Sequence, residues 1–287
     1  MTGGLPLLAS GTGPGSVASV TPSPRNPEHR GVHEEPFAYA DVMKHVRAKN
    51  RRLPILIVNH MYADYLIARA SLTRTGTGGT VDMPIPENVR MYDIAGAAHI
   101  NVREQNKACR EGHSQLDWSP ALRAQLVALD EWVRGKVAPP PNQLMVLERR
   151  ADDPDVLQAP VYLAPVVVLV PKLDRDGNPL GGIRLPDIEV PIASHGYPNA
   201  AAAVPICRQA GTYRPFARTV SERKNANDVR LSLEERYPGG LNEYVSKIRQ
   251  AVRSLIRERL LLEEDGIVIT HAAAENPSFR PSTPRSQ

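Results

Sequence analysis

Two side chains that can take part in proton transfer follow two apolar segments of the chain. Asp64 comes shortly after residues 53–58 (LPILIV), and His99 comes shortly after residues 89–94 (VRMYDI). An imidazole titrates near neutral pH, and a carboxylate bonded to one of its nitrogens orients the ring and stabilises its protonated form. If the two segments are neighbouring parallel strands, their carboxyl ends meet at one edge of the sheet. The expected chemistry is proton transfer by His99, oriented by Asp64.

Each of these residues also has a purely structural interpretation. His99 is equally typical of a loop histidine bonded to backbone groups, and Asp64 is typical of a helix N-cap, a role that is compatible with catalysis. Asp93 lies inside the second segment and is a second, more strained candidate for the acid. His60 is predicted to be a solvated loop histidine, and Asp82 is predicted to be a turn residue.

The elements that must position these residues alternate between strand and helix. Residues 53–58 form a β-rich run without polar alternation, which is typical of a parallel strand buried on both faces. A helix is predicted over residues 64–72 and a second strand over residues 89–94. Apolar residues at spacings of three and four predict another helix over residues 119–133, with Ser119 as its cap. This order predicts an α/β fold.

A second region follows the proline-rich residues 139–142, which are typical of a stiff linker. Residues 144–147 and 161–170 predict strands. Residues 174–178 (DRDGN) predict a turn rather than a calcium loop, because the glycine comes too early and no glutamate closes the loop. We therefore expect a β-rich extension.

Helix signals mark the C-terminal part of the chain. Ser232 and Glu235 predict a capping box. The last long helix is predicted from one apolar stripe: Tyr244, Val245, Ile248, Val252, Leu255 and Ile256. The expected organisation is a disordered low-complexity tail (1–35), a core (36–138), a β-rich extension with C-terminal helices (139–275) and a disordered tail (276–287).

Composition excludes several classes of protein. The 287 residues are 41% hydrophobic and 23% charged, with a net charge of +4 and no basic block interleaved with aromatic residues, so nucleic acid is not an expected partner. No apolar run is long enough to span a membrane, and the amino terminus lacks a convincing signal peptide. Cys109 and Cys207 allow one optional bridge and leave the compartment open, with the cytoplasm as the default expectation.

Several separated motifs of the chain resemble one known family. They are NHMYADYLIARASLTRT, TVDMPIPENVRMYDIAGAAH, LDWSPALRAQLVALDEWV, DGNPLGGIRLPDIEVPIA and SLEERY. Over residues 37–274 they resemble the C-terminal half of the large α/β-hydrolase-domain proteins. The resemblance implies part of an α/β-hydrolase sheet and the hydrolysis of a small ester-like substrate with no cofactor. It places His99 at the histidine position and Asp64 at the acid position, where the family usually carries glutamate.

One member of the family's catalytic triad, the nucleophile, has no counterpart in this sequence. The family's nucleophile is the serine of a G-x-S-x-G turn, which comes before the acid and the histidine in the chain. The nearest string here, residues 112–116 (GHSQL), ends in leucine and follows His99, so we expect Ser114 to be a bystander. Ser16 and Ser19 have no strand before them. The nucleophile half of the domain is therefore expected to be absent from this chain.

Three hypotheses follow from the sequence. The first is an ester hydrolase region that carries the acid and the histidine and needs a complementary upstream fragment for activity. The second is a non-catalytic, truncated or split hydrolase that serves as an interaction module, since a sheet without its other strands exposes an edge. The third is a small-ligand binder, which predicts a deep apolar pocket between residues 161–170 and the C-terminal helices.

Overall fold

A computed structural model describes residues 39–49, 51, 53–67, 70–74, 82–101, 107, 109–149, 169–196, 199 and 205–280. Its elements in chain order are α1 (Tyr39–Ala48), β1 (Leu56–Met61), α2 (Tyr62–Ile67), the 3-10 helix η3 (Ala70–Thr73), β2 (Val89–Ile94), α3 (Ser119–Val133), β3 (Leu147–Glu148), β4 (Val170–Pro171), α4 (Pro186–Glu189), β5 (Ala193–Gly196), α5 (Pro205–Ala210), β6 (Thr212–Pro215), α6 (Val220–Asn225), α7 (Leu233–Arg236), α8 (Gly240–Arg257), α9 (Glu263–Ala274) and the 3-10 helix η5 (Pro277–Phe279).

Strands β1 and β2 are parallel neighbours, as the sequence predicts. Their register runs from Leu56 opposite Val89 to Met61 opposite Ile94. β2 has the predicted bounds, whereas β1 lies three residues further along the chain than predicted. Pro54 has no N–H to donate to a ladder, and the polar residues after the apolar run still pair in register with β2. The apolar run in the sequence therefore predicts that a strand is present here but does not predict where it begins and ends.

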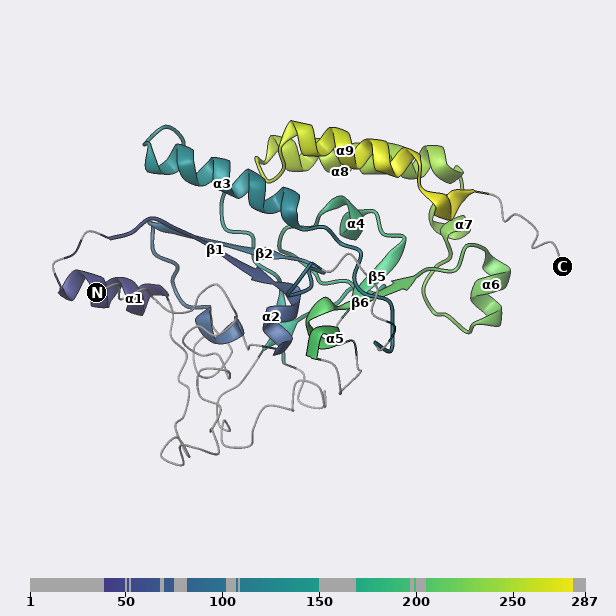
Figure 1. The fold of residues 1–287 in the computed structure, drawn as a ribbon, viewed down its shortest axis with the longest axis horizontal. Helices are drawn as coiled ribbons and strands as arrows, with labels where there is room; N and C mark the ends of the chain where they lie inside the picture. Colours follow the sequence, from purple (N-terminus) through teal and green to yellow (C-terminus); the bar gives the residue numbers. More distant parts are fainter. Residues whose placement is uncertain are drawn as a thin grey trace, which may run out of the picture.

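Helices cover both faces of the β1–β2 pair, which makes this part of the chain a layered α/β unit (Figure 1). On one face, Val58 and Met91 pack against Tyr39 and Met43 of α1. On the other face, Ile94 belongs to a larger buried cluster with side chains of α3, α4 and α8. The larger cluster joins residues from both sides of the predicted boundary at residue 138, so the two regions share a core.

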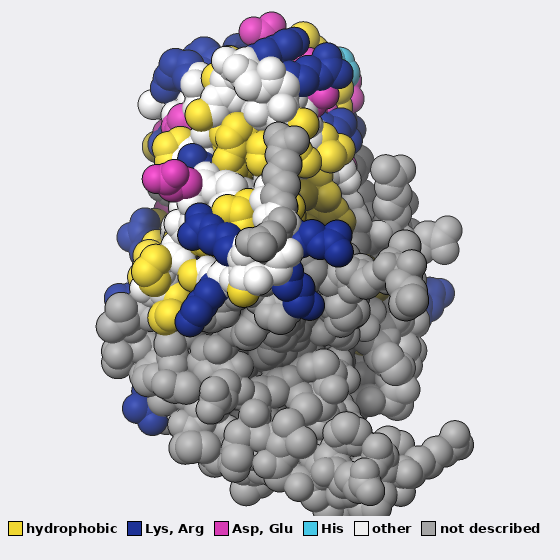
Figure 2. All heavy atoms as spheres, turned by 90° about the vertical axis from the view of Figure 1, so that its left-hand side faces the viewer, with side chains coloured by type: hydrophobic (Ala, Val, Ile, Leu, Met, Phe, Trp, Pro, Cys, Tyr) yellow, Lys and Arg dark blue, Asp and Glu magenta, His cyan; other side chains and the backbone are white. Residues whose placement is uncertain are grey.

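Helix α3 has the predicted bounds but a different orientation from the one that its large apolar residues suggest. Its cap residue is Trp118 and not Ser119, and it turns its alanines inward (Ala121, Ala124 and Ala128). Leu126 and Val133 are 66% and 62% exposed. The face shown in Figure 2, the left-hand side of Figure 1, has hydrophobic side chains gathered among Lys and Arg. Small inward residues let the helix lie close to the strands, and the large ones are left at the surface.

The extension contains less strand than expected. β3 and β4 are two residues each, and β5 pairs with β6 over four residues, both antiparallel. Most of the predicted strand over residues 161–170 lies outside the described residues. Short bridges, such as Ile94 to Ile183, extend the sheet beyond β2. The region is held mainly by helices, and the predicted capping box of Ser232 and Glu235 begins the short α7.

The end of the described chain is more ordered than expected. Residues 276–280 were predicted to belong to a disordered tail. Instead Asn276 caps η5, and Phe279 stacks on Tyr244 with ring centroids 4.9 Å apart. This contact fixes the end of the described part of the chain to the start of α8, where the predicted apolar stripe is buried.

Two glycines let the extension approach β2 closely. Gly181 and Gly182 both have positive φ, and a Cβ on Gly182 would lie 2.6 Å from the carbonyl oxygen of Asp93. The same approach allows Ile183 N–H to donate to that oxygen at 2.7 Å. Because a side chain would collide with backbone, only glycine fits at residue 182. Among the described residues, no helix has the length and apolar character needed to cross a membrane.

Candidate acid–base site

The structure brings Asp64 and His99 together. His99 Nδ1 lies 2.6 Å from Asp64 Oδ1, and the two side chains are 20% and 12% exposed. Asp64 lies in the first turn of α2, directly after β1, and His99 lies in the loop after β2. A backbone bond from Ala63 N–H to Ala97 O, 3.1 Å long, joins the two connections. The predicted proximity is confirmed, and the catalytic role remains a prediction.

Asp64 is fixed by a second hydrogen bond. Its Oδ2 accepts from the backbone N–H of Met61 at 2.9 Å. α2 begins at Tyr62, so Asp64 is the third helical residue and reaches back to the residue before the helix, instead of being the N-cap itself. A carboxylate in the first turn also interacts favourably with the helix dipole. Both oxygens therefore have defined partners, and the one bonded to His99 cannot swing away freely.

The Asp64 carboxylate changes the protonation of His99. Its hydrogen bond raises the pKa of His99 above the ordinary 6.5, its charge acts in the same direction, and partial burial of the ring opposes both. No described residue bonds to Nε2 of His99. With Nδ1 held by the carboxylate, Nε2 is the nitrogen available to exchange a proton with a reacting group.

We expect Asp64→Asn to lower the pKa of His99 below 6.5, because partial burial is then the main remaining influence. The raised pKa in the folded protein means that the pair stabilises it fully below about 6.5, and that this stability is lost as the pH rises through the folded pKa. NMR titration of the ring protons measures both variants. His195 is an internal control, since burial alone lowers its pKa to about 4. An unchanged His99 pKa would contradict the assignment.

A buried charged cluster that the sequence did not predict surrounds Asp93 of β2. Asp93 is fully buried and accepts hydrogen bonds from Tyr65 Oη at 2.9 Å, Met145 N–H at 2.8 Å and Arg74 Nη1 at 3.2 Å. His60 Nδ1 lies 3.2 Å from the other carboxylate oxygen. Asp93 therefore does not serve His99, and it joins β2 to β1, α2 and the segment before β3.

Two predictions near this cluster need correction. His60 was expected to be a solvated loop histidine, but β1 extends through it and buries it, with Nε2 3.2 Å from Thr73 Oγ1. Asp82 was expected to be a turn residue, and its exposed carboxylate instead forms a bidentate pair with Arg74, with both N–O distances 3.0 Å. Arg74 thus links an exposed carboxylate to the buried one of Asp93.

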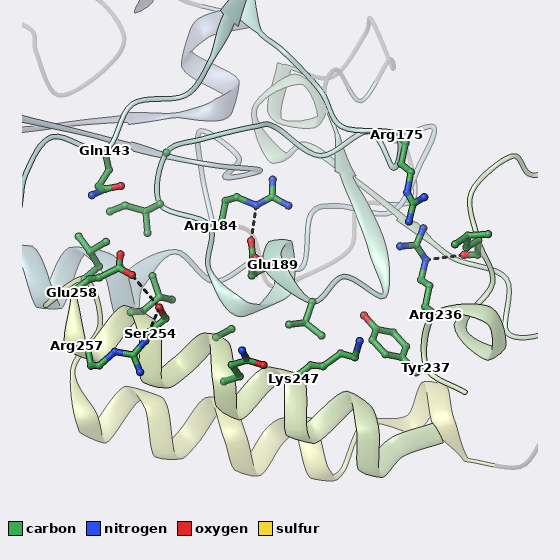
Figure 3. Close-up of a pocket in the computed structure, with 18 of the residues that line it drawn as sticks. Gln143, Arg175, Arg184, Glu189, Arg236, Tyr237, Lys247, Ser254, Arg257 and Glu258 are labelled. Carbon is green, nitrogen blue, oxygen red and sulfur yellow. Dashed lines mark hydrogen bonds and ion pairs between the residues drawn. The ribbon is translucent and has the colours of Figure 1, made fainter. Parts of the chain in front are cut away.

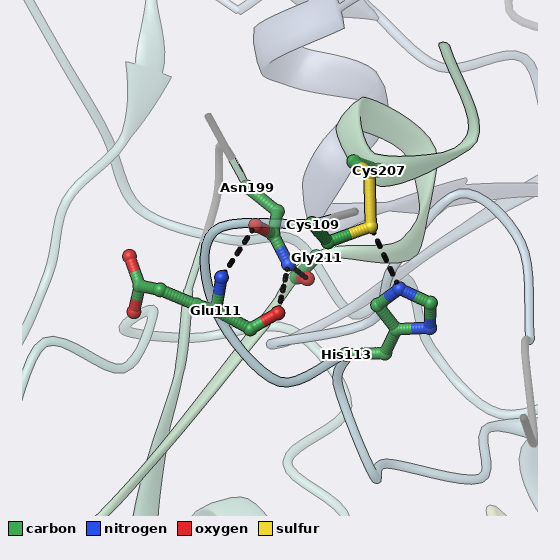
Figure 4. The surroundings of a disulfide bond; sticks show 6 residues. All are labelled: Cys109, Glu111, His113, Asn199, Cys207 and Gly211. Carbon is green, nitrogen blue, oxygen red and sulfur yellow. Dashed lines mark hydrogen bonds between the residues drawn. A yellow bond between two sulfur atoms is a disulfide. The ribbon is translucent and has the colours of Figure 1, made fainter. Parts of the chain in front are cut away.

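A disulfide holds the loop that follows His99. Cys109 and Cys207 are bonded, which joins this loop to α5 (Figure 4). Asn199 strengthens the junction, because its side chain bonds to the backbone N–H and O of Glu111 and to Gly211 O. Ile100 N–H, next to His99, donates to Gln209 O of α5 at 3.2 Å. The bridge that the sequence left open thus anchors the histidine loop.

Ser114 lies in a different environment from His99. Its Oγ is 3.2 Å from Nδ1 of His195, and both side chains are buried. Burial lowers the pKa of His195 to about 4, so its ring is neutral at pH 7. His195 lies in β5. Ser114 is thus bonded to His195 and not to His99, and its role as a bystander stays a prediction.

A cleft of about 720 Å³ lies between α8 and the segment containing Arg184 and Glu189 (Figure 3). Neither Asp64 nor His99 lines it. Its charges are largely paired already: Arg184 Nε lies 2.9 Å from Glu189, and Arg236 binds Asp176 outside the lining. A ligand would have to displace these pairs. The cleft is polar, and residues 161–168, beside which the small-ligand hypothesis places its apolar pocket, lie outside the described residues.

Residues 174–178 form the predicted turn, in which Gly177 N–H donates to Asp174 O at 3.0 Å. Asp174 Oδ1 accepts from the backbone N–H groups of Asp176 and Asn178, at 2.9 and 3.0 Å, which is an Asx-type turn. The side chain of Asn178 then bonds to β5. Across the described ranges, no cluster of His, Cys, Asp and Glu is suited to hold a metal ion.

A family model described as an alpha/beta hydrolase domain matches residues 38–271. Comparisons with curated proteins and with solved structures gave no match. The matched range includes β1, β2, the Asp64–His99 pair and most of the helical extension.

Proposed function

We propose, from the premise that this chain belongs to the alpha/beta hydrolase domain family, that it contributes the acid and the histidine of an ester hydrolase. The observation that carries the proposal is the 2.6 Å contact between His99 Nδ1 and Asp64 Oδ1, with Nε2 left without a partner among the described residues. This is the arrangement that a Ser-Asp-His triad requires of its second and third members.

In the proposed reaction, His99 Nε2 takes the proton of a serine hydroxyl while the serine oxygen bonds to the ester carbonyl carbon. The imidazolium then gives this proton to the oxygen of the leaving alcohol, and the carbon–oxygen bond of the ester breaks. Water repeats the sequence on the acyl-enzyme and releases the acid. Asp64 stays ionised and stabilises the charged ring, and backbone amides supply the oxyanion site.

The serine is proposed to come from a complementary hydrolase fragment. The sequence contains no G-x-S-x-G turn, and Ser114 is bonded to His195. The fragment would place its serine at Nε2 of His99, at the edge of the sheet where β1 and β2 both end. Its substrate would be a small ester-like molecule that enters between the two parts.

The open edge of β1 supports a fragment that adds a strand. Within the described residues β1 pairs with β2 alone, and Leu56 N–H donates to Asn88 O. Because alternate residues of a parallel ladder face the same neighbour, the backbone groups of Ile57 and Asn59 face away from β2. Asn59 Oδ1 is buried without a hydrogen-bond partner. A parallel strand on this side would supply acceptors for the N–H groups and donors for the carbonyl oxygens of Ile57 and Asn59.

Reconstitution tests the proposal. The chain is assayed alone and mixed with an upstream fragment that carries a G-x-S-x-G turn, using a p-nitrophenyl ester and a fluorophosphonate probe that reacts with activated serines. We expect labelling of the fragment's serine and ester hydrolysis in the mixture only, with no labelling of this chain. Labelling of this chain alone would contradict the proposal. The matched control is the mixture with His99→Ala, which is expected to lose both signals.

A second candidate function is a non-catalytic interaction module. The exposed Leu126 and Val133 of α3 favour it, because an apolar helix face beside an open strand edge is typical of a binding surface. The same mixing experiment separates the two. Stable binding of the fragment, measured by calorimetry, without hydrolysis or labelling would favour the module over the hydrolase.

A further inference from the structure

Helix α9 carries apolar residues on its outer side as well as its inner side. Gly266 and Ala273 are buried, whereas Ile267 and Val268 are 71% and 66% exposed. A helix that is apolar all round is normally buried on all sides. The outer side of α9 therefore has the composition of a covered surface.

A groove with apolar walls runs beside the exposed Ile267. It has a volume of about 810 Å³ and is formed by α8 and α9, with Val252 and Ile256 on the α8 wall. The two helices are in close contact, because a Cβ on Gly266 would lie 2.7 Å from a methyl group of Val252. The groove is therefore a shallow seam along the helix pair, open on its outer side.

Unpaired charges lie at both ends of this groove. Arg249 on α8 and Glu263 at the start of α9 lie near its two ends, and Arg253 lies between them. All three side chains are exposed, and none of them forms an ion pair or hydrogen bond within the described part of the chain. Surface charges beside an apolar seam are available to pair with a partner.

The positions of these charges follow from the antiparallel packing of α8 and α9. Gly266 is level with Val252 and Ile256. At a rise of about 1.5 Å per residue, Arg249 is then level with the last turn of α9, at the opposite end from Glu263. Ile267 lies about midway between these two levels. A second α9, laid antiparallel across the first with Ile267 at the crossing, would place its Glu263 beside Arg249.

We propose that this surface, formed by α8 and α9, is a two-fold interface between two copies of this chain. Each copy sets Ile267 into the seam of the other, and Glu263 of each copy pairs with Arg249 of the other, so the ion pair forms twice. In an isologous dimer the same surface of both copies forms the interface, so its groups must be able to pair with those of an identical surface. The dimer does not involve the Asp64–His99 pair or the open edge of β1, so it is independent of the proposed hydrolase activity.

Charge reversal tests this interface on the full chain. In R249E both interfacial pairs become acidic, and in E263R both become basic, so we expect each variant to raise the dimer dissociation constant about tenfold or more. An equimolar mixture of the two variants forms a heterodimer in which both pairs are again opposite in charge. We expect the mixture to regain the association of the wild type, measured by sedimentation equilibrium over a range of concentrations.

Two further variants complete the experiment. Ile267→Asp is expected to give a monomer, because it places a charge in the apolar seam. Val229→Asp is the matched control, since Val229 is also exposed but lies between α6 and α7, and it should dimerise like the wild type. Circular dichroism confirms that each variant is folded. A monomeric wild type at all concentrations, or a mixture of R249E and E263R that fails to associate, would overturn the proposal.

Discussion

Replacing His99 with glutamine is expected to lower ester hydrolysis in the reconstituted mixture by about 10⁴-fold. Glutamine can still bond to Asp64, but it cannot take a proton from a serine at neutral pH. Asp64→Asn should cost about 10³- to 10⁴-fold, because an amide favours the wrong tautomer of His99 and does not stabilise its protonated form. Steady-state hydrolysis of the p-nitrophenyl ester measures both losses.

Two variants make this prediction specific to the Asp64–His99 pair. Ser114→Ala should leave the rate within a few-fold of the wild type, because Ser114 is bonded to His195. Asp64→Glu restores the residue that the family resemblance places at this position and should keep substantial activity. If Ser114→Ala abolished hydrolysis while His99→Gln did not, the assignment of the base would be wrong.

The second large effect concerns stability and lies at Asp93. Asp93→Asn is expected to lower the free energy of unfolding by about 3–5 kcal/mol, because it leaves the buried guanidinium of Arg74 without its buried counter-charge. The bond from Met145 N–H would weaken as well, since it would then reach a neutral acceptor. Urea denaturation followed by circular dichroism measures the change.

The second carboxylate partner of Arg74, Asp82, provides a control for this prediction. Asp82 is 51% exposed, whereas Asp93 is fully buried. Asp82→Asn should therefore cost only about 0–1 kcal/mol, as exposed ion pairs do. The double variant Arg74→Met with Asp93→Asn should lose less than the sum of its single variants, because no uncompensated charge remains. If D82N and D93N lowered the free energy of unfolding equally, the burial of the carboxylate would not be what determines the loss of stability.

The Asp64–His99 pair could be predicted because its geometry is local to two strand ends. Each residue follows a recognisable apolar strand, and parallel neighbours place such residues at one edge. The bounds of β2 and α3 followed from equally local signals. The start of β1 did not, since a continuous apolar run contains no signal for where pairing begins.

Features that depend on distant segments could not be predicted in the same way. Asp93 receives bonds from Arg74 and Met145, which approach it only in the folded chain. One signal was available, because a single acidic residue in an otherwise buried strand requires compensation. The orientation of α3 was equally inaccessible, because its alanines and leucines recur at similar spacings and the neighbouring strands decide between them. Pairing of cysteines separated by 98 positions leaves no local pattern.

The covalent bond between Cys109 and Cys207 has a consequence for the integrity of the polypeptide. The two cysteines are 98 positions apart in the sequence, and the span between them includes β3, β4 and β5. Proteolytic cleavage anywhere inside that span would not release two molecules. The piece with Asp64 and His99 would stay tethered to the piece with α8 and α9 until a thiol reductant separated them.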